Sequence, residues 1–422
     1  MSLAEARAGD ASAHIVIAGG GMVGLSLALM LDRALPHEVR ISLIEGARMP
    51  PADAVSAPYH PSFDARSTAL SYSSFQCYQE LGIWADLEPG LGPIERIHVS
   101  RRGRFGSSLL EAREQGWPAL GWVVENPCLG RVLLAAVQQR PRIELRCPLR
   151  VSEAVPEGSG MRVSLDGESV FADLLVIADG AESALREKLG FLTHRKRYAQ
   201  HALIANLSFE TSHGGCAFER FTAEGPLALL PLASTAEAKH RMALVWSLLP
   251  DAATQMVECG EGEFAAGLLD AFGQRLGRVL RVGERLTYPL ALTDAVEQVR
   301  RGCVVLGNAA HALHPVAGQG FNLALRDADS LTRNLVEVIE RQGLSGPALG
   351  DPGVLSRYFA DRQRDQVQTI AASDGLPSLF MHSDPLLSLG RDMALSGLDF
   401  MPGLRREFVK QAAGMAALEA AR

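Results

Sequence analysis

An apolar strand, a glycine-rich turn and an apolar helix open the chain, and this order constrains the fold more than any other feature. The stretch HIVIAGGGMVGLSLALMLDRALPHEVRISLIEG covers residues 14–46 and ends in a second apolar strand. Strand, short turn, helix and strand in this order are typical of a βαβ unit with parallel strands. The sequence therefore predicts a Rossmann-like domain.

The turn carries the glycine spacing of dinucleotide-binding folds. Gly19, Gly21 and Gly24 fit G-x-G-x-x-G directly after the strand, and Glu45 ends the next strand about 20 residues further on. In order, these glycines permit the tight turn, admit a pyrophosphate to the backbone N–H groups, and let the helix pack closely. We expect Glu45 to bind a ribose diol, the alternative being a purely structural turn. A similar spacing at 260–265, GEGEFA, follows no apolar strand and predicts a helix instead.

Composition limits the classes of function. With 422 residues we expect more than one domain, and 48 acidic against 41 basic residues argue against nucleic acid as the main partner. Six scattered cysteines predict reduced thiols rather than disulfides or a zinc cluster. The opening MSLAEARAGDASAH lacks an apolar signal segment, and no apolar run reaches the roughly 18 residues that cross a bilayer. We expect a cytoplasmic protein, bound to a membrane peripherally at most.

The chain is expected to leave the dinucleotide-binding domain and return to it twice. Short strands such as LIANLSF, AFERF and RMALVWSLL predict an inserted, mostly antiparallel sheet domain for the substrate, and the tail is helical. The fold class is α/β, with a ligand expected between the two domains. The predicted limits are 12–75, 118–190 and 284–345 for the dinucleotide-binding domain, 76–117 and 191–283 for the sheet domain, and 346–422 for the helical C-terminal region.

A second signal is DLLVIADGAESALREKLG, residues 173–190. Asp179 and Gly180 end an apolar strand, and Ser183 and Arg186 follow at helix spacing. Taken alone, an ordinary strand-to-helix turn with an Asp cap explains this stretch as well as a ligand site does.

A third signal is GNAAHALHPVAGQGFNLALRDA, residues 307–328. His311, His314 and Asp327 suggest a metal site, but further ligands cannot be named, so we expect no metal. The stretch instead predicts backbone held close to a flat or phosphorylated ligand. The residues that indicate this are Pro315, Gly318 and Gly320.

The three signals in this order resemble the class A FAD-dependent aromatic hydroxylases, the para-hydroxybenzoate hydroxylase class, over roughly residues 14–345. FDARSTALSYSS at 63–74, VVENP at 123–127 and the tail RDMALSGLDFMPGLRREFVKQAAGM look like the ubiquinone-biosynthesis hydroxylases. The likeness is greatest to the branch that acts on 2-polyprenyl-6-methoxyphenol. Most of the class has Gly-Asp where this chain has Gly307-Asn308, and the Asn variant looks like that branch.

The resemblance implies an FAD site assembled from all these segments. The glycine turn and Glu45 would hold the ADP half, Arg66 would approach the pyrophosphate or flavin, and Asn126 and Arg131 would add contacts. Asp179 and Gly180 would support the FAD and the nicotinamide side. The residues implied at the isoalloxazine are Asn308, Pro315, Gly318, Gly320 and Asn322, with His311 and His314 as packing residues.

The resemblance also implies the chemistry. NADPH or NADH would reduce FAD, O2 would be taken up as a flavin C4a-hydroperoxide, and one oxygen would pass to a polyprenyl phenol, giving the 1,4-benzoquinol. No catalytic base is named, since structural roles explain Tyr288 and His201 better. Two alternatives stay open. One is hydroxylation at another ring carbon or of a different phenol, and the other is a flavin-binding protein or dehydrogenase without monooxygenase activity.

A polyprenyl chain would need an apolar channel, which LALLPLA (227–233) and VWSLL (245–249) could line, although ordinary core is the better interpretation. The tail from Leu376 to Met415 could cap the flavin domain or lie on a membrane or partner protein. We favour the cap, with weak association with the inner membrane or a ubiquinone-biosynthesis complex. A homo-oligomer is compatible with the sequence but not specified by it.

Overall fold

The computed structural model describes residues 13–50, 66–103, 107–315, 318–381 and 402–415. It opens with the predicted βαβ unit: β1 (His14–Ala18), α1 (Met22–Ala34) and β2 (Arg40–Ile44). β1 and β2 pair in parallel, and every residue of β1 is buried. The predicted N-terminal Rossmann-like unit is confirmed.

Six strands form the sheet of this domain. Their order is β19 (Val299–Arg300), β20 (Cys303–Val305), β12 (Leu174–Ile177), β1, β2 and β8 (Ile143–Arg146). All neighbours are parallel except β19 and β20. From β1 the chain passes to β2 on one side, whereas β12 joins the other side much later. In open α/β sheets a ligand binds at the carboxyl ends of the strands beside such a reversal.

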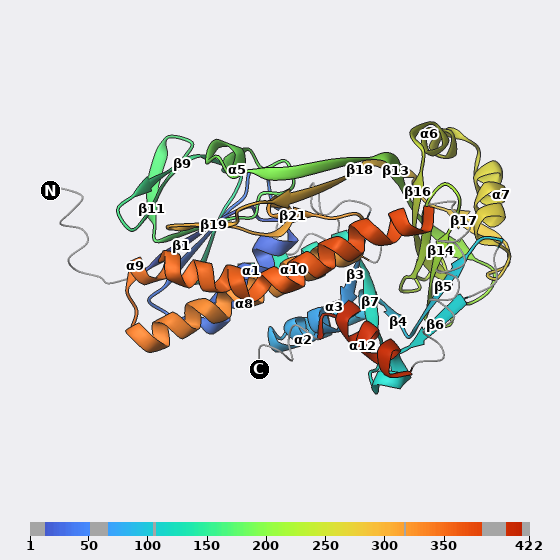
Figure 1. The fold of residues 1–422 in the computed structure, drawn as a ribbon, viewed down its shortest axis with the longest axis horizontal. Coiled ribbons are helices and arrows are strands. Elements are labelled where there is room, and N and C mark those ends of the chain that lie inside the picture. The colour runs from blue at the N-terminus through green and yellow to red at the C-terminus, as the bar shows by residue number, and fades with distance from the viewer. Residues whose placement is uncertain (1–12, 51–65, 104–106, 316–317, 382–401, 416–422) are drawn as a thin grey trace.

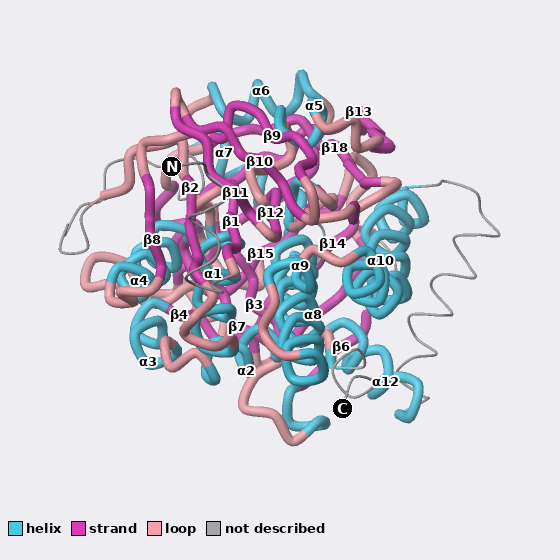
Figure 2. Tube along the Cα trace, turned by 90° about the vertical axis from the view of Figure 1, so that its left-hand side faces the viewer, coloured by secondary structure: helices cyan, strands magenta, loops and turns pink. Residues whose placement is uncertain are grey.

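This sheet is covered on both faces (Figure 2). On one face Ile15 and Ile17 share a core with α1, α4 (Asn126–Gln138), α8 (Gln319–Gln342) and α10 (Pro352–Met381). On the other face Val16 and Ala18 pack on an antiparallel sheet of β9 (Val151–Glu157), β10 (Gly160–Leu165) and β11 (Glu168–Ala172). Because side chains alternate along a strand, β1 contributes to both cores.

A nine-stranded sheet forms the other end of the molecule (Figure 1). Its order is β21 (His311–Ala312), β18 (Leu286–Ala295), β13 (Thr193–Phe209), β16 (Arg241–Leu248), β15 (Pro226–Pro231), β14 (Cys216–Phe221), β5 (Arg96–Arg101) and β6 (Ser107–Glu111), with β17 (Val279–Val282) beside β13. Only β14 and β5 pair in parallel, so the predicted mostly antiparallel sheet is confirmed. β18, which the predicted limits give to the dinucleotide-binding domain, pairs with β13 in this sheet.

The two faces of the nine-stranded sheet have different neighbours. On the outer face, Leu229 and Trp246 pack with α6 (Pro250–Glu258) and α7 (Glu261–Phe272). The opposite face, which we call the inner face, is turned toward the rest of the molecule. There Ala217 and Ala243 pack with Val123 of a small sheet made of β3 (Ser67–Ser71), β7 (Gly121–Glu125) and β4 (Leu91–Ile94).

Glu125 at the end of β7 fixes the contact between these two sheets. Its Oε1 accepts hydrogen bonds from Asn206 Nδ2 and Arg241 Nη2, each 2.9 Å away. Arg241 Nη1 also donates to Glu125 Oε2 over 3.1 Å. This bidentate arginine–carboxylate pair is directional, so it sets the orientation of the inner face relative to β7.

The sequence pattern of residues 68–81 predicts a helix over that whole stretch, but the helix in the structure begins only at Tyr72. Residues Ser67–Ser71 form β3, paired with β7, and α2 covers Tyr72–Glu80. The Ser71 hydroxyl caps this helix by accepting a hydrogen bond from Ser74 N. Pairing with β7 therefore overrides local helix preference at the start of this stretch. The glycine pair of GEGEFA lies at the start of α7, as expected.

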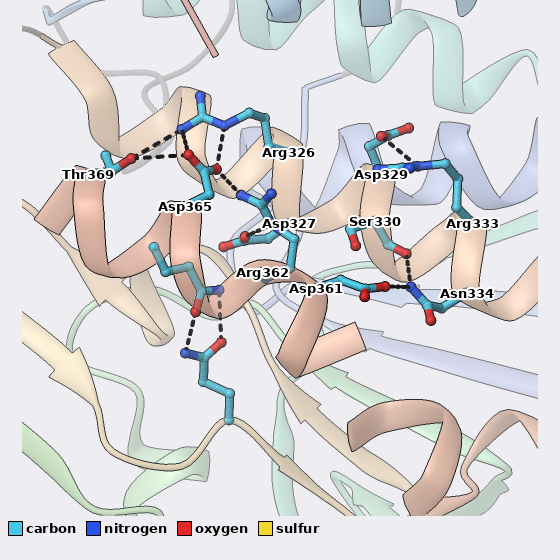
Figure 3. Close-up of polar contacts among 12 residues, drawn as sticks. Arg326, Asp327, Asp329, Ser330, Arg333, Asn334, Asp361, Arg362, Asp365 and Thr369 are labelled. Atoms are coloured by element: carbon cyan, nitrogen blue, oxygen red, sulfur yellow. Dashed lines mark hydrogen bonds and ion pairs between the residues drawn. The ribbon is translucent and has the colours of Figure 1, made fainter. Parts of the chain in front are cut away.

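Buried charges hold α10 along α8 (Figure 3). Arg326 donates to Asp365 over 2.8 Å, Arg362 donates to Asp327 over 2.7 Å, and Arg362 also pairs with Asp365. Asp327 is 1% exposed and Arg362 4%. Since each of these charges faces an opposite one, their burial is tolerated, and α10 fixes the position of α8.

The C-terminal helix α12 (Pro402–Ala412) lies against the rest of the protein. Val409 is buried among residues of the inner face, Arg405 pairs with Glu114, and Ala413 O accepts from Ser73 N over 3.2 Å. Arg391, part of the tail considered above, lies outside the described residues. In the part of the chain that the structure describes, no helix is both long and apolar enough to span a bilayer.

Candidate functional site

The turn after β1 is closed tightly enough to require glycine. Gly19 has φ of +115°, and a Cβ added to it would lie 2.4 Å from the Ala178 oxygen. A Cβ on Gly24 would lie 1.9 Å from the Gly19 oxygen. Gly21 is the N-cap of α1 and has no side chain with which to cap it. The first N–H groups of α1 are therefore left for a ligand.

Glu45 lies beside this turn. Its Oε2 accepts from Gly20 N and its Oε1 from Ala47 N, both over 2.7 Å. These bonds hold the carboxylate against the glycine loop, which is the placement that a ribose contact requires. The ribose contact itself stays a prediction.

The second and third predicted segments follow neighbouring strands of the same sheet. Asp179 and Gly180 come after β12, and Gly307 and Asn308 come after β20, so both pairs share the carboxyl edge with the glycine turn. Asp179 is exposed, yet the surrounding protein still excludes enough water to raise the pKa of its carboxyl. The cap of the following helix α5 (Ala184–Lys188) is Ser183, rather than the Asp considered above.

Arg186 on α5 joins these two segments. Its side chain is 0% exposed, and its Nη1 donates to Ala309 O over 2.7 Å and to Ala181 O over 3.2 Å. Ala309 ends the short 3-10 turn Gly307–Ala309. The sequence pattern alone indicates no role for Arg186, because an arginine at helix spacing after a cap is usually exposed.

Helix α8 begins in the third segment. Its N-cap is Gly318, with φ of +59°, which again leaves the first N–H groups without a side-chain cap. Asn322 is 1% exposed: its Oδ1 accepts from Ser71 N (2.8 Å) and Ser74 Oγ (2.7 Å), and its Nδ2 donates to Ala69 O (2.8 Å) and Gly318 O (2.9 Å). Asn322 therefore clamps β3 and α2 to the start of α8.

Pro315 and Gly320 flank the start of α8 and are partly exposed. Between them, Val316 and Ala317 lie outside the described residues, as do Phe63 to Ala65 of the FDAR stretch.

Arg66 and Asn126 meet through the backbone. Asn126 N donates to Arg66 O over 2.9 Å, and Asn126 Oδ1 accepts from Thr68 Oγ1 over 2.7 Å. The exposed Arg66 guanidinium lies 5.5 Å from the centre of the Tyr288 ring. Arg131 is exposed on α4. The structure thus brings Arg66, Asn126 and Tyr288 together, while the contacts expected of each with FAD stay predictions.

The two sheet residues considered as bases lie on opposite faces. Tyr288 is paired with Ala202 and lies on the inner face, whereas His201 is paired with the outer-core residue Leu248. By strand alternation, His201 points to the outer face, away from Tyr288.

His311 and His314 are packed into the protein. His311 is 3% exposed, with its Nδ1 3.0 Å from Asp294 Oδ1. Burial lowers the pKa of His314 to about 4, and the ring of Tyr198 meets it edge-on. Within the described ranges, no three His, Cys, Asp or Glu side chains gather as a metal-binding group.

The carboxyl edge of the six-stranded sheet therefore has the features of an FAD site. The start of α1 suits a pyrophosphate, because its N–H groups and helix dipole favour negative charge. The start of α8 suits the electron-accepting edge of a flavin ring for the same reason. The glycine cradle and Glu45 match the ADP half. Bound FAD supplies the redox and oxygen-transfer chemistry, while the chain supplies binding, orientation and exclusion of water.

A family model described as FAD binding domain matches residues 12–369. The chain belongs to this FAD-binding domain family. FAD as the cofactor, which the family resemblance implied, is thereby confirmed.

Two curated relatives of this FAD-binding protein match it over nearly their whole length. Ubiquinone hydroxylase UbiL of Rhodospirillum rubrum is 33% identical, over 96% of this chain and 90% of its own. The 3-demethoxyubiquinol 3-hydroxylase of Escherichia coli K12 is 31% identical, over 95% and 98%. The expected enzyme class, FAD-dependent hydroxylases, is confirmed.

Solved structures share the fold of this FAD-binding protein. The p-nitrophenol 4-monooxygenase PnpA of Pseudomonas putida DLL-E4 has a TM-score of 0.74 at 19% identity, covering 95% of this chain and 98% of its own. The probable FAD-dependent monooxygenase pqsL of Pseudomonas aeruginosa has a TM-score of 0.70 at 19% identity, covering 87% and 97%.

Proposed function

We propose that this protein hydroxylates the ring of a polyprenylated phenol in ubiquinone biosynthesis, with NADPH or NADH as reductant and O2 as co-substrate. The observation that carries the proposal is the contact between Arg66 and Tyr288. Arg66 belongs to the proposed FAD site, and Tyr288 lies on the inner face of the nine-stranded sheet, so the contact places the two side by side. The two curated relatives support the substrate class, since one is named a ubiquinone hydroxylase and the other a 3-demethoxyubiquinol 3-hydroxylase.

The inner face offers surface suited to an aromatic ring and a prenyl tail. Ala228, Val245 and Ile204 follow one another in a single row across three strands, and the first two are partly exposed. Apolar rows of this kind bury ring and chain without competing for hydrogen bonds. Leu229 and Trp246, from the stretches considered for a channel, instead belong to the outer core.

Each residue of the FAD site has a proposed task. The N–H groups at the starts of α1 and α8 hold the pyrophosphate and the flavin edge, and Glu45 holds the ribose. Asn322 acts by fixing the start of α8 rather than by touching the ring, because protein groups already engage its amide. The remaining proposed contacts are Arg66, Asn126, Arg131, Asp179, Gly180, Asn308, Pro315, Gly318 and Gly320.

Two ring positions are proposed. The first is that expected from the sequence, conversion of 2-polyprenyl-6-methoxyphenol to the 1,4-benzoquinol. The second is another ring carbon of the same pathway, and the name of the Escherichia coli relative, a 3-demethoxyubiquinol 3-hydroxylase, favours it. Both use the same FAD site, because the ring carbon is chosen by how the phenol is oriented.

The test is a mass-spectrometric profile of quinone lipids from cells lacking this protein, with and without its restoration. Accumulation of 2-polyprenyl-6-methoxyphenol supports the first position, and accumulation of a demethoxyubiquinol supports the second. An unchanged ubiquinone pool would remove the pathway from the proposal. Oxygen uptake by the purified yellow protein, stimulated by a prenylated phenol and coupled to product, separates a hydroxylase from a flavin binder or dehydrogenase.

We also propose weak contact with a membrane surface or a complex of the pathway, since a polyprenyl substrate partitions into lipid. On α12, Arg406 is exposed, and basic residues beside apolar ones favour an anionic interface. Co-sedimentation with vesicles containing anionic lipid tests this. Binding equal to that of neutral vesicles would contradict it.

A further inference from the structure

Glu219 of β14 lies on the inner face. Its neighbour Phe218 meets Phe272 of α7 on the outer face, with ring centroids 5.3 Å apart. Ala217 packs with Val123 on the inner side. Because side chains alternate along a strand, Glu219 shares the face of Ala217.

The row that contains Glu219 is otherwise apolar across the central strands. Ala228 of β15 and Val99 of β5 lie directly opposite it. The row continues with Val245 of β16 and Ile204 of β13, which are the residues proposed above for the substrate. Val99, Glu219 and Ala228 are each partly exposed, so this part of the row is open rather than closed by core packing.

The carboxyl of Glu219 has one oxygen that is fully buried and unpaired. In the part of the chain that the structure describes, Oε1 has no hydrogen-bond partner. Burial raises the pKa of this carboxyl to about 7. A buried polar atom without a partner costs free energy, and native proteins keep few of them, so a ligand donor is a natural partner for Oε1.

Neighbouring charged side chains do not account for the raised pKa of Glu219, whose cause is burial. The strands β5 and β15 flank β14. Among their described residues, the one charged side chain on the inner face is Arg101 of β5, which is paired with Phe221, two residues along β14 from Glu219. Arg220 points to the outer face, where it donates to Ala271 O. On α10, which ends beside β14, Asp374 is engaged by Lys196 and Tyr198.

We infer that Glu219, which is partly exposed, is a catalytic residue whose carboxyl accepts the phenolic O–H of the substrate. This inference rests on the proposed function. A prenylated phenol on the inner face would have its phenolic O–H as its one strong hydrogen-bond donor, and Glu219 is the acidic residue of the row that it would contact. A phenol that gives up its proton becomes a better nucleophile at the ring, which is what oxygen transfer needs. The phenolic O–H bond breaks, the proton moves to the carboxylate, and the electron pair stays on the phenolic oxygen. The proton returns to that oxygen when the hydroxylated carbon loses its ring hydrogen as a proton to solvent and the ring regains aromaticity.

The test compares the full-length FAD-loaded protein with Glu219→Gln, Glu219→Asp and the control Glu224→Gln. Glu224 is an exposed acid in the same hairpin. The probes are 2-methoxy-6-prenylphenol and its O-methyl ether, which lacks the donor. Binding is followed by the change in FAD absorbance, and hydroxylation by product formed per NADPH oxidised.

For wild type and Glu224→Gln we expect a preference for the phenol over the ether that increases as pH rises through about 7, where Glu219 ionises. In Glu219→Gln the preference should fall about tenfold or more, because a hydrogen bond to a charged group is lost. Its kcat/KM should lose the pH step, and Glu219→Asp should recover part of the rate. Ether binding should change little.

A Glu219→Gln protein with wild-type phenol preference and wild-type pH profile would overturn the inference while leaving the proposed function intact. If wild type neither binds nor hydroxylates the phenol, both fail. If Glu219→Gln loses FAD or folds poorly, the pH dependence of wild type decides the test. A wild-type preference for the phenol over the ether that does not change with pH would contradict the inferred role of Glu219.

Discussion

The guanidinium of Arg186, on α5, donates a hydrogen bond to the main-chain oxygen of Ala309, 2.7 Å away. Ala309 belongs to the turn that follows β20, and a Cβ on Gly307 of that turn would lie 3.1 Å from Val23 Cγ1 of α1. One buried cation thus ties the Asp179 segment to the third segment, which in turn rests on the helix of the glycine turn. The three stretches proposed to form the FAD site are therefore connected to one another through packing and this hydrogen bond.

Replacing Arg186 by Met should loosen this connection. We expect FAD affinity to fall about tenfold, because a hydrogen bond from a charged donor to Ala309 O is lost. Flavin fluorescence during titration of the apoprotein measures the dissociation constant. The control is Arg278→Met, which removes an exposed arginine paired with Glu210 far from the site. Equal FAD affinity in both variants would show that Arg186 does not support the site.

We expect opposite effects from replacing a glycine by alanine in the turn after β1 and in GEGEFA (260–265). Gly24→Ala should abolish FAD retention, because its Cβ would overlap the Gly19 oxygen at 1.9 Å. Gly262→Ala, in GEGEFA, should retain FAD and gain about 0.5 to 1 kcal/mol of stability, because it is an exposed helical glycine with open space around it. Flavin content after gel filtration and thermal midpoints test both. A yellow Gly24→Ala protein would contradict the assignment.

The glycine turn was predictable because its signal is local: a strand, three glycines and an acid at fixed spacing. Arg186 and Glu219 were not, because their significance depends on burial and on partners far away in sequence. The same limit applies to the stretches 227–233 and 245–249, considered above as the lining of a channel. Their alternating pattern predicts two faces of a strand, but it does not predict which face packs on α7. This limit also explains β3, whose pairing with β7 is long-range and overrides a helical pattern.

A substitution at Asn322 tests whether its amide holds β3 and α2 to the start of α8 or instead contacts FAD. Asn322→Asp removes the donor to Ala69 O and Gly318 O and sets a carboxylate beside them. We expect stability to fall by about 2 to 4 kcal/mol from two unsatisfied buried carbonyls. Because the lost bonds are within the protein, the drop in thermal midpoint should appear in apoprotein and FAD-loaded protein alike. A drop confined to the loaded protein would indicate that the amide contacts FAD.

The pairing of α8 with α10 predicts strong coupling between two buried charges. Arg362→Met should destabilise the protein by about 3 to 5 kcal/mol, because Asp327 is left charged and 1% exposed. Adding Asp327→Leu should restore much of that loss by removing the orphaned carboxylate. Chemical unfolding of the single and double variants measures the interaction. Additive losses would mean that the pair does not act as a unit.

Glu219 should make the folded protein less stable as pH rises. Its pKa is about 7 in the fold against an ordinary 4.5, so between these values the folded state holds a proton that the unfolded chain has released. The stability this provides is fully present below pH 4.5 and is lost as pH rises through 7. Glu219→Gln carries no such proton, so its stability relative to wild type should grow by roughly 1 to 3 kcal/mol from about pH 5 to about pH 8. Unfolding across that range, with Glu224→Gln as the exposed control, measures the difference. A constant offset between Glu219→Gln and wild type would mean that the carboxyl ionises at its ordinary pKa and meets water after all.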